Sequence, residues 1–310
     1  MPYTGELAGL ATAILWAFTS LFFAEAGRLV GSFTVNKIRL LIAVIFCTAL
    51  SAAASGSFIP QGVNAQQWFW LGLSGVVGLV IGDSCGFKAL VMIGPRLATL
   101  IYASTPIMTT AIAWVFLGER LSMIDLFAIS LTIGGISWVL LEQRYNRNGP
   151  VDIDKSHPDS GTLLKGILLA LGAAVGQAAG LVLAKHGMFN AGGTVEPLQA
   201  SHVRMVSALL VIWTFTAVRR QLPQALKAMR NPRALVFSGA GAFVGPFLGV
   251  WMSLVAVKYI PAGLAATLNS TTPVMILPLI IFWRREKVSL RAALGAILTV
   301  GGVALLFLHS

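Results

Sequence analysis

The chain is 310 residues long; 56% of its residues are hydrophobic, only 11% are charged, and its formal net charge is +11. Its mean hydropathy of +0.82 excludes a soluble protein, because so few charges cannot cover a water-facing surface of this size. Nucleic-acid binding is excluded as well, because the basic residues stand in short stretches between apolar runs and no soluble basic domain could carry it.

Ten apolar runs follow one another along the chain, each long enough to cross a bilayer as a helix. Backbone groups in lipid must pair within their own segment, and the period-two alternation of a membrane barrel is absent, so the fold class is all-α integral membrane. The predicted spans are 7–26, 33–53, 68–91, 95–118 and 122–141 in the first half, and 163–185, 198–218, 235–257, 262–283 and 290–308 in the second.

The polar stretch 143–161 separates these two sets of spans. It is the only long polar segment, and it predicts a linker between a first domain, 1–142, and a second, 162–310. The first span follows residues 1–7, which carry no Lys or Arg, and this predicts a retained helix rather than a signal peptide. Cys47 and Cys85 lack the spacing of a disulfide or metal pair, so neither a disulfide nor a metal site is implied. We expect no cofactor either.

The second half repeats the first at a constant shift. Pro106 recurs as Pro273, a shift of 167 positions that also relates Gly134 to Gly301. A repeat of five spans ends on the opposite face of the membrane, so its copy must be inserted upside down. The sequence therefore predicts ten transmembrane helices in two inverted-topology five-helix repeats, an arrangement found in secondary transporters with the binding site between the halves.

The loops support the inversion, because matched loops differ in basic residues. The stretch 55–67 has no Lys or Arg, whereas the loop at the matching place in the second half holds Arg219, Arg220, Lys227, Arg230 and Arg233. The positive-inside rule then places the odd-numbered loops in the cytoplasm and both termini outside.

These motifs resemble the drug/metabolite transporter superfamily, in its EamA-type branch with ten spans in two EamA repeats. The likeness covers nearly the whole chain. It rests on Arg39 and Arg204 early in the second span of each half, on ILWA at 14–17, GDSCGFKAL at 82–90, IGPRLA at 93–98, STPIM at 104–108, LGERLS at 117–122, STTPVM at 270–275, RREKVS at 284–289, and the GG pair closing each half.

The resemblance implies a secondary transporter that exports or imports a small metabolite. We expect an exporter of compounds such as amino acids that acts by alternating access in the plasma membrane (the bacterial inner membrane), as a monomer or homodimer. It implies no ATPase activity, and no phosphate-binding loop is present. Family members of known architecture keep both termini in the cytoplasm, against the orientation that the charges predict. The alternatives are an integral-membrane enzyme acting on lipid-linked substrates and a membrane scaffold; the scattered histidines and the missing large polar loop disfavour the enzyme.

Two ionisable residues lie within the predicted third span, where charge is costly. Asp83 is too deep to reach water; it binds a cationic group or a coupling proton, or it pairs with a nearby cation such as Lys88 or Arg96. An ion pair with Lys88 within one helix is disfavoured by their separation of about 140° around the axis. Lys88 itself is either a substrate contact or a side chain that extends to the membrane surface.

Four further charges are candidates for gating or for structural roles. Arg39 and Arg204 either gate an anionic substrate or tie helix ends to Glu25 and Glu196. Glu119 and Glu286 each follow the end of a helix, where the helix dipole disfavours an anion, so each needs a cation such as Arg120 or Lys287. We expect them to hold loops.

Polar residues before the shared prolines form the last candidate set. Tyr102 and Thr105 match Asn269 and Thr272, where proline bends the helix; they line a binding cavity, or their hydroxyls satisfy a packing hinge. Trp16 either walls that cavity or packs in the core. The pairs Gly78/Gly82 and Gly245/Gly249 predict close helix contacts. Asp83 has no counterpart, because its repeat mate is Val250, and there we expect the substrate.

Overall fold

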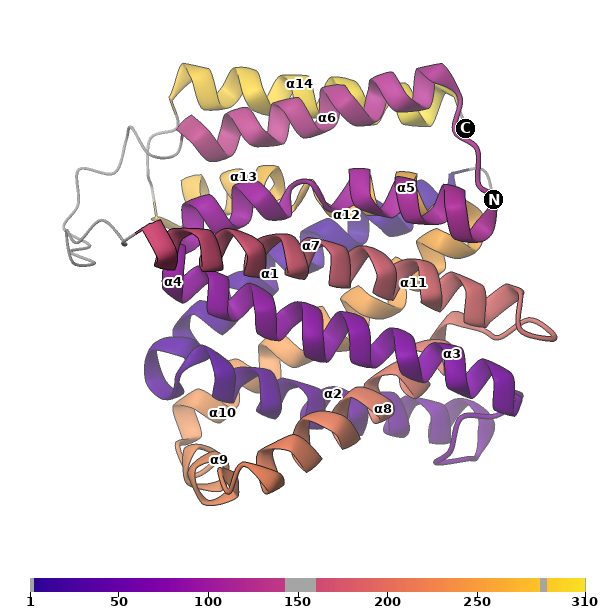
Figure 1. Cartoon of the computed structure of the whole chain (residues 1–310), viewed down its shortest axis with the longest axis vertical. Helices are drawn as coiled ribbons and strands as arrows, with labels where there is room; N and C mark the ends of the chain where they lie inside the picture. The colour runs from indigo at the N-terminus through magenta and orange to yellow at the C-terminus, as the bar shows by residue number, and fades with distance from the viewer. Residues whose placement is uncertain (1–2, 143–159, 285–288, 310) are drawn as a thin grey trace.

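The computed structural model describes residues 3–142, 160–284 and 289–309, and every regular element within these ranges is a helix. The helices lie side by side across the long axis of the molecule (Figure 1). The predicted all-α membrane fold is confirmed. The first half contains α1 (Thr4–Val30), α2 (Ser32–Ser55), α3 (Ala65–Gly75), η1 (Val76–Gly82), α4 (Asp83–Tyr102), α5 (Thr105–Leu117) and α6 (Met123–Glu142).

The second half contains the matching set. It consists of α7 (Ser160–Phe189), α8 (Pro197–Val218), the short α9 (Leu222–Ala228), α10 (Pro232–Ala242), η2 (Phe243–Gly249), α11 (Val250–Tyr259), α12 (Ala262–Asn269), α13 (Thr272–Arg284) and α14 (Leu290–His309). Nine helical segments among the described residues are long and apolar enough to cross a membrane. The ninth predicted span, 262–283, is divided into α12 and α13, because the chain turns at Ser270 and Thr271 before Pro273.

The duplication is visible in the backbone as well as in the sequence. The segments η1 and η2 are π-helical turns, a rare conformation, and the shift of 167 residues relates both their first and their last residues. Figure 1 shows α1 beginning on the face where the two termini lie, whereas α7 begins on the opposite face. The two halves therefore run through the molecule in opposite directions, as five spans per repeat require.

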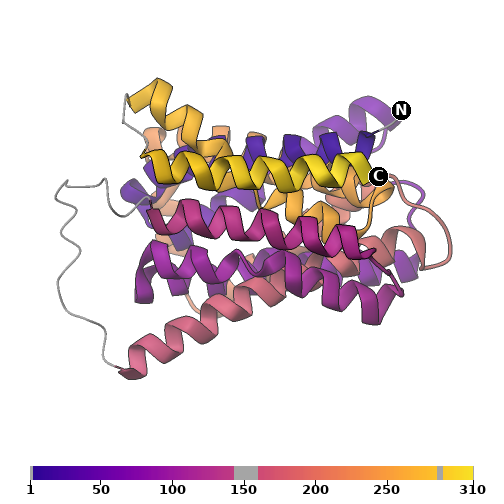
Figure 2. The same cartoon turned by 90° about the horizontal axis from the view of Figure 1, so that it is seen from above.

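The first helix of each half packs against the other half. α1 contacts α10, η2, α11 and α12, and α7 contacts α3, η1, α4 and α5. The last helices, α6 and α14, also pack together and lie next to each other in both views (Figures 1 and 2). In that pair Gly135 faces Thr299 and Gly302 faces Thr132, which are the same contact repeated by the pseudo-two-fold. The halves are thus interlocked rather than merely adjacent.

The predicted glycine contacts are present, and they hold η1 against α7. A Cβ atom on Gly180 would lie 2.9 Å from the Cα atom of Gly78, and one on Gly176 would lie 2.8 Å from that of Gly82. In the second half Gly245 meets Thr19 and Gly249 meets Trp16, both on α1. Small residues let helix backbones approach this closely, and in lipid such packing is a main source of helix association.

We expect Gly180→Ala to lower the unfolding free energy by about 1–3 kcal/mol, because the added methyl group meets backbone atoms that cannot move aside. The measurement is unfolding of the purified protein in mixed micelles. Gly134→Ala is the control, because Gly134 lies within α6 and a Cβ atom there meets nothing within 4 Å. Equal stability of the two variants would contradict the tight contact between η1 and α7.

Candidate functional site

A cavity of about 350 Å³ lies between the two halves. Both halves supply its wall, which combines aliphatic and aromatic side chains with hydroxyl groups, one amide-bearing residue from each of α7 and α12, one acid and one arginine. The residues that line it are Trp16, Ser20, Leu79, Asp83, Thr99, Tyr102, Ala103, Thr105, Thr109, Ile136, Leu140, Gln177, Leu181, Arg204, Val250, Ser253, Ala266, Asn269, Ser270, Thr272 and Pro273.

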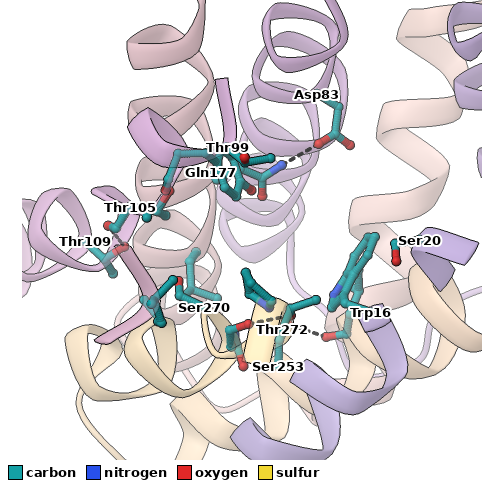
Figure 3. A pocket seen from close by; sticks show the side chains of 18 of the residues that line it. Trp16, Ser20, Asp83, Thr99, Thr105, Thr109, Gln177, Ser253, Ser270 and Thr272 are labelled. Atoms are coloured by element: carbon teal, nitrogen blue, oxygen red, sulfur yellow. Dashed lines mark hydrogen bonds between the residues drawn. The ribbon is translucent and has the colours of Figure 1, made fainter. Parts of the chain in front are cut away.

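Seven of the residues predicted from the sequence meet at this cavity. They come from six helices in both halves, and they are Trp16, Asp83, Tyr102, Thr105, Arg204, Asn269 and Thr272. Figure 3 shows Gln177 pointing toward Asp83, with Trp16, Ser253 and Thr272 on the other side of the pocket. The pairs Tyr102/Thr105 and Asn269/Thr272 reach the cavity because two helices break at matching places.

At each helix break, a threonine hydroxyl donates a hydrogen bond to a backbone carbonyl of the same turn. Proline lacks an N–H group, so the turn before it leaves carbonyl groups without a partner. Thr105 donates its hydroxyl to the carbonyl of Tyr102 at 2.6 Å, and Thr272 donates its hydroxyl to that of Asn269 at 2.9 Å. The hydroxyls therefore stabilise the turns, and the same residues also lie in the cavity wall. That this cavity binds a ligand stays a prediction.

Asp83 is paired with Arg39 rather than with Lys88, and the side chain of Arg96 lies outside what the structure describes. The Arg39 guanidinium donates to one carboxylate oxygen, and the Gln177 amide donates to the other at 2.5 Å. The Arg39 side chain is only 3% exposed. Its Nε atom donates to Asn36 at 2.7 Å, and its guanidinium lies over the rings of Phe23 and Phe87. A buried pair with this many partners joins α2, α4 and α7 beside the cavity.

The alternative partners proposed for the two arginines are wrong. Glu25 pairs with Arg28 instead of Arg39, and Glu196 pairs with Lys258 instead of Arg204. Neither arginine ties down a helix end, because both side chains are buried within their spans. Arg204 lines the cavity, and within the described part of the chain its guanidinium has neither a hydrogen bond nor an ion pair; its Nε atom is buried without a partner.

Glu119 lies away from the cavity, in the turn between α5 and α6. One of its oxygens pairs with Lys185 of α7 at 2.7 Å, and the other accepts the backbone N–H of Ala262, the first residue of α12, at 2.8 Å. The partner is thus Lys185 rather than Arg120, and the carboxylate lies at a helix N-terminus, where the dipole favours an anion. Lys185 also donates to the carbonyl of Ile260 at 2.7 Å, so this network joins the two halves.

Among the described candidates, Lys88, like Arg39 and Glu119, is not part of the cavity wall. Lys88 is exposed on the outer surface of α4, which fits a side chain that extends to the membrane surface. Glu286 lies outside the described residues. Sequence reasoning did not single out Gln177, Ser20, Thr99 or Ser253. Gln177 carried a signal that could have found it, since it is an amide in an apolar span, between Gly176 and Gly180; the three hydroxyl residues carried none, because serine and threonine are common in membrane helices.

Three comparisons place the chain among known proteins. Residues 3–141 and 164–308 each match the model of the EamA-like transporter family. A protein of Archaeoglobus fulgidus, named "Uncharacterized transporter", is 23% identical over 304 residues, which are 97% of each chain. A solved structure described as "Crystal structure of protein" covers 100% of this chain and 98% of its own with a TM-score of 0.75; at 18% identity this likeness shows the fold alone.

We expect Arg39→Gln to destabilise the protein by about 3–5 kcal/mol, because it leaves the carboxylate of Asp83 buried without its ion-pair partner. Adding Asp83→Asn should restore much of this loss, since the remaining amide is neutral. Unfolding of the single and double variants in mixed micelles measures both effects.

Arg28→Gln is the matched control, because its ion pair with Glu25 is exposed, with side-chain exposures of 69% and 44%. Such pairs contribute about 0–1 kcal/mol. An effect of Arg39→Gln no larger than that of Arg28→Gln would show that Asp83 does not depend on Arg39.

Proposed function

Since the chain belongs to the EamA-like transporter family, we propose that it is a secondary transporter that exports a small metabolite, such as an amino acid or a related compound, across the plasma membrane by alternating access. The matches of the family model to both halves bear out the resemblance found in the motifs. The observation that carries the proposal is the cavity between the halves, lined by polar groups from both repeats. A small solute fits a volume of this size.

The repeat architecture supports alternating access. Two halves that are related by a pseudo-two-fold in the membrane plane can exchange conformations, so that the cavity opens first to one side and then to the other. Helix breaks at Gly94, which has φ 77°, and before Pro106 and Pro273 provide places where backbone angles can change. The network of Glu119, Lys185 and the N-terminus of α12 joins the halves outside the cavity. A complete transport cycle must either break these contacts or move the residues that form them together.

Flux through the cavity is testable in proteoliposomes with a panel of amino acids, nucleobases and drugs. We expect gradient-dependent movement of at least one solute by the unchanged protein. Ser253→Trp should reduce that flux to the level of protein-free vesicles, because the indole fills the cavity that Ser253 lines. Ser253→Ala, which removes only the hydroxyl, should retain flux.

Ser130→Trp is the matched control. Ser130 also donates its hydroxyl to the carbonyl one turn back, as Ser253 does, but it is exposed on α6 and is not part of the cavity wall. No flux of any solute by the unchanged protein, or full flux through Ser253→Trp, would contradict the proposal.

We propose that the basic face is cytoplasmic and that both termini lie outside. Arg219, Arg220 and Lys227 lie at or beside α9, on the face opposite the termini (Figure 1). A reporter that is active only in the cytoplasm should therefore be inactive when fused to the C-terminus and active when inserted in the linker 143–159. The reverse result would give this chain the usual family orientation, with the loop charges overridden.

A further inference from the structure

Arg204 is a buried cation that forms no ion pair with any acid in the described part of the chain. It lies on α8, its surface is 4% exposed, and it lines the cavity. Asp83 acts on it through space, but no acceptor among the described residues bonds its guanidinium, and its Nε atom has no partner. A guanidinium carries five N–H donors, and a buried charge that stays unpaired is strongly destabilising. This arrangement is expected where a ligand supplies the missing anion.

Asp83 does not bond Arg204 in the described part of the chain. One of its oxygens accepts from Arg39 and the other from Gln177. Among the described residues that line the cavity, Asp83 and Arg204 are the only ones with charged side chains. Arg39, which is not part of the cavity wall, neutralises the charge of Asp83. One positive charge therefore remains at the cavity wall, and it favours an anionic group of the substrate over the cationic group that Asp83 alone suggested.

The repeat shows which group is missing. Arg39 lies seven residues after Ser32, the first residue of α2, and Arg204 lies seven residues after Pro197, the first residue of α8. Each is thus the counterpart of the other. Asp83 directly follows η1, and Val250 directly follows η2 and lines the cavity. In the first repeat Asp83 is the acid that pairs with Arg39. In the second repeat Val250 takes the matching sequence position, so this position provides no acid for Arg204.

We propose that the substrate carries a carboxylate, and that Arg204 binds it in the position that Asp83 occupies on Arg39. The inference rests on the proposed transport function. A guanidinium matches a carboxylate with two parallel hydrogen bonds. One spare positive charge fits a single carboxylate better than a doubly charged phosphate. The other walls accept an uncharged body, with Trp16, Leu79 and Leu140 as apolar contacts and the hydroxyls of Ser253 and Thr272 as hydrogen-bonding groups.

The test uses matched acids and amides as probes: 3-phenylpropionate, 4-methylvalerate, phenylalanine and leucine, each beside its primary amide, with phenethylamine as a cation. Binding to the purified protein is measured by thermal stabilisation, and flux is measured in proteoliposomes. We expect at least one acid to bind and its amide to bind about 10- to 100-fold more weakly, as the loss of a charge-assisted hydrogen-bond pair implies. The simple acids and the amino acids distinguish a free carboxylate from a zwitterion.

Arg204→Gln should abolish the preference for acid over amide, and Arg204→Lys should keep it with weaker binding. Arg219→Gln, the same change at an exposed position at the end of α8, should leave it intact. Val250→Asp offers a second route that does not remove Arg204. The new carboxylate should pair with Arg204, abolish acid binding, and leave the protein at least as stable as Val250→Asn does.

The outcomes separate the two proposals. Flux of phenethylamine or of the amides without flux or binding of the acids would overturn the carboxylate inference and leave transport standing. An unchanged acid preference in Arg204→Gln, or a Val250→Asp variant much less stable than Val250→Asn, would also overturn it. Absence of both binding and flux for every probe and every solute of the wider panel would overturn the transport function and the inference together.

Discussion

A charge that is buried in the interior of a membrane protein needs an opposite charge close by, and the pair of Arg39 and Asp83 meets this constraint beside the cavity. Because water cannot solvate either group, the guanidinium and the carboxylate are held by each other, by Asn36 and by Gln177. Those partners come from three helices. The pair therefore fixes how α2, α4 and α7 are arranged, and with them one wall of the cavity.

That arrangement depends on backbone features that the two halves share. The π-turn η1 ends immediately before Asp83, and Gly78 and Gly82 on the same turn let α7 approach closely enough for Gln177 to reach the carboxylate. The second half keeps the π-turn and its glycines, and these glycines pack against Thr19 and Trp16 of α1. The residue that follows this π-turn is Val250 instead of an acid. One backbone design thus supports two different walls.

The asymmetry between these walls links stability to function. On one side of the cavity Asp83 and Arg39 of the first half and Gln177 of the second half satisfy each other, so that wall is complete without a ligand. On the other side Arg204 faces the cavity and bonds no acid among the described residues. On our proposal, one side of the cavity holds the ion pair of Arg39 and Asp83. On the other side the repeat provides only the arginine, and the carboxylate of the substrate pairs with it.

Much of this could be read from the sequence. The apolar runs predicted the spans, the constant shift predicted the repeat, and an odd number of spans predicted the inversion, because each of these is a local or periodic property of the chain. Trp16, Asp83 and the residues before Pro106 and Pro273 were found for the same reason, as polar or aromatic groups at marked positions in apolar runs.

The partners of the charged residues could not be read in this way. Arg39 and Asp83 are joined across 44 positions, and Glu119 meets Lys185 and Ala262 in the other half, so sequence reasoning assigned neighbours such as Lys88 and Arg120 instead. The sequence alone determined the spans, the duplication and the positions where charge enters the membrane. Only the tertiary structure decided which charges meet, and that Arg204 forms no ion pair within the described ranges, because pairing depends on how the two halves interlock.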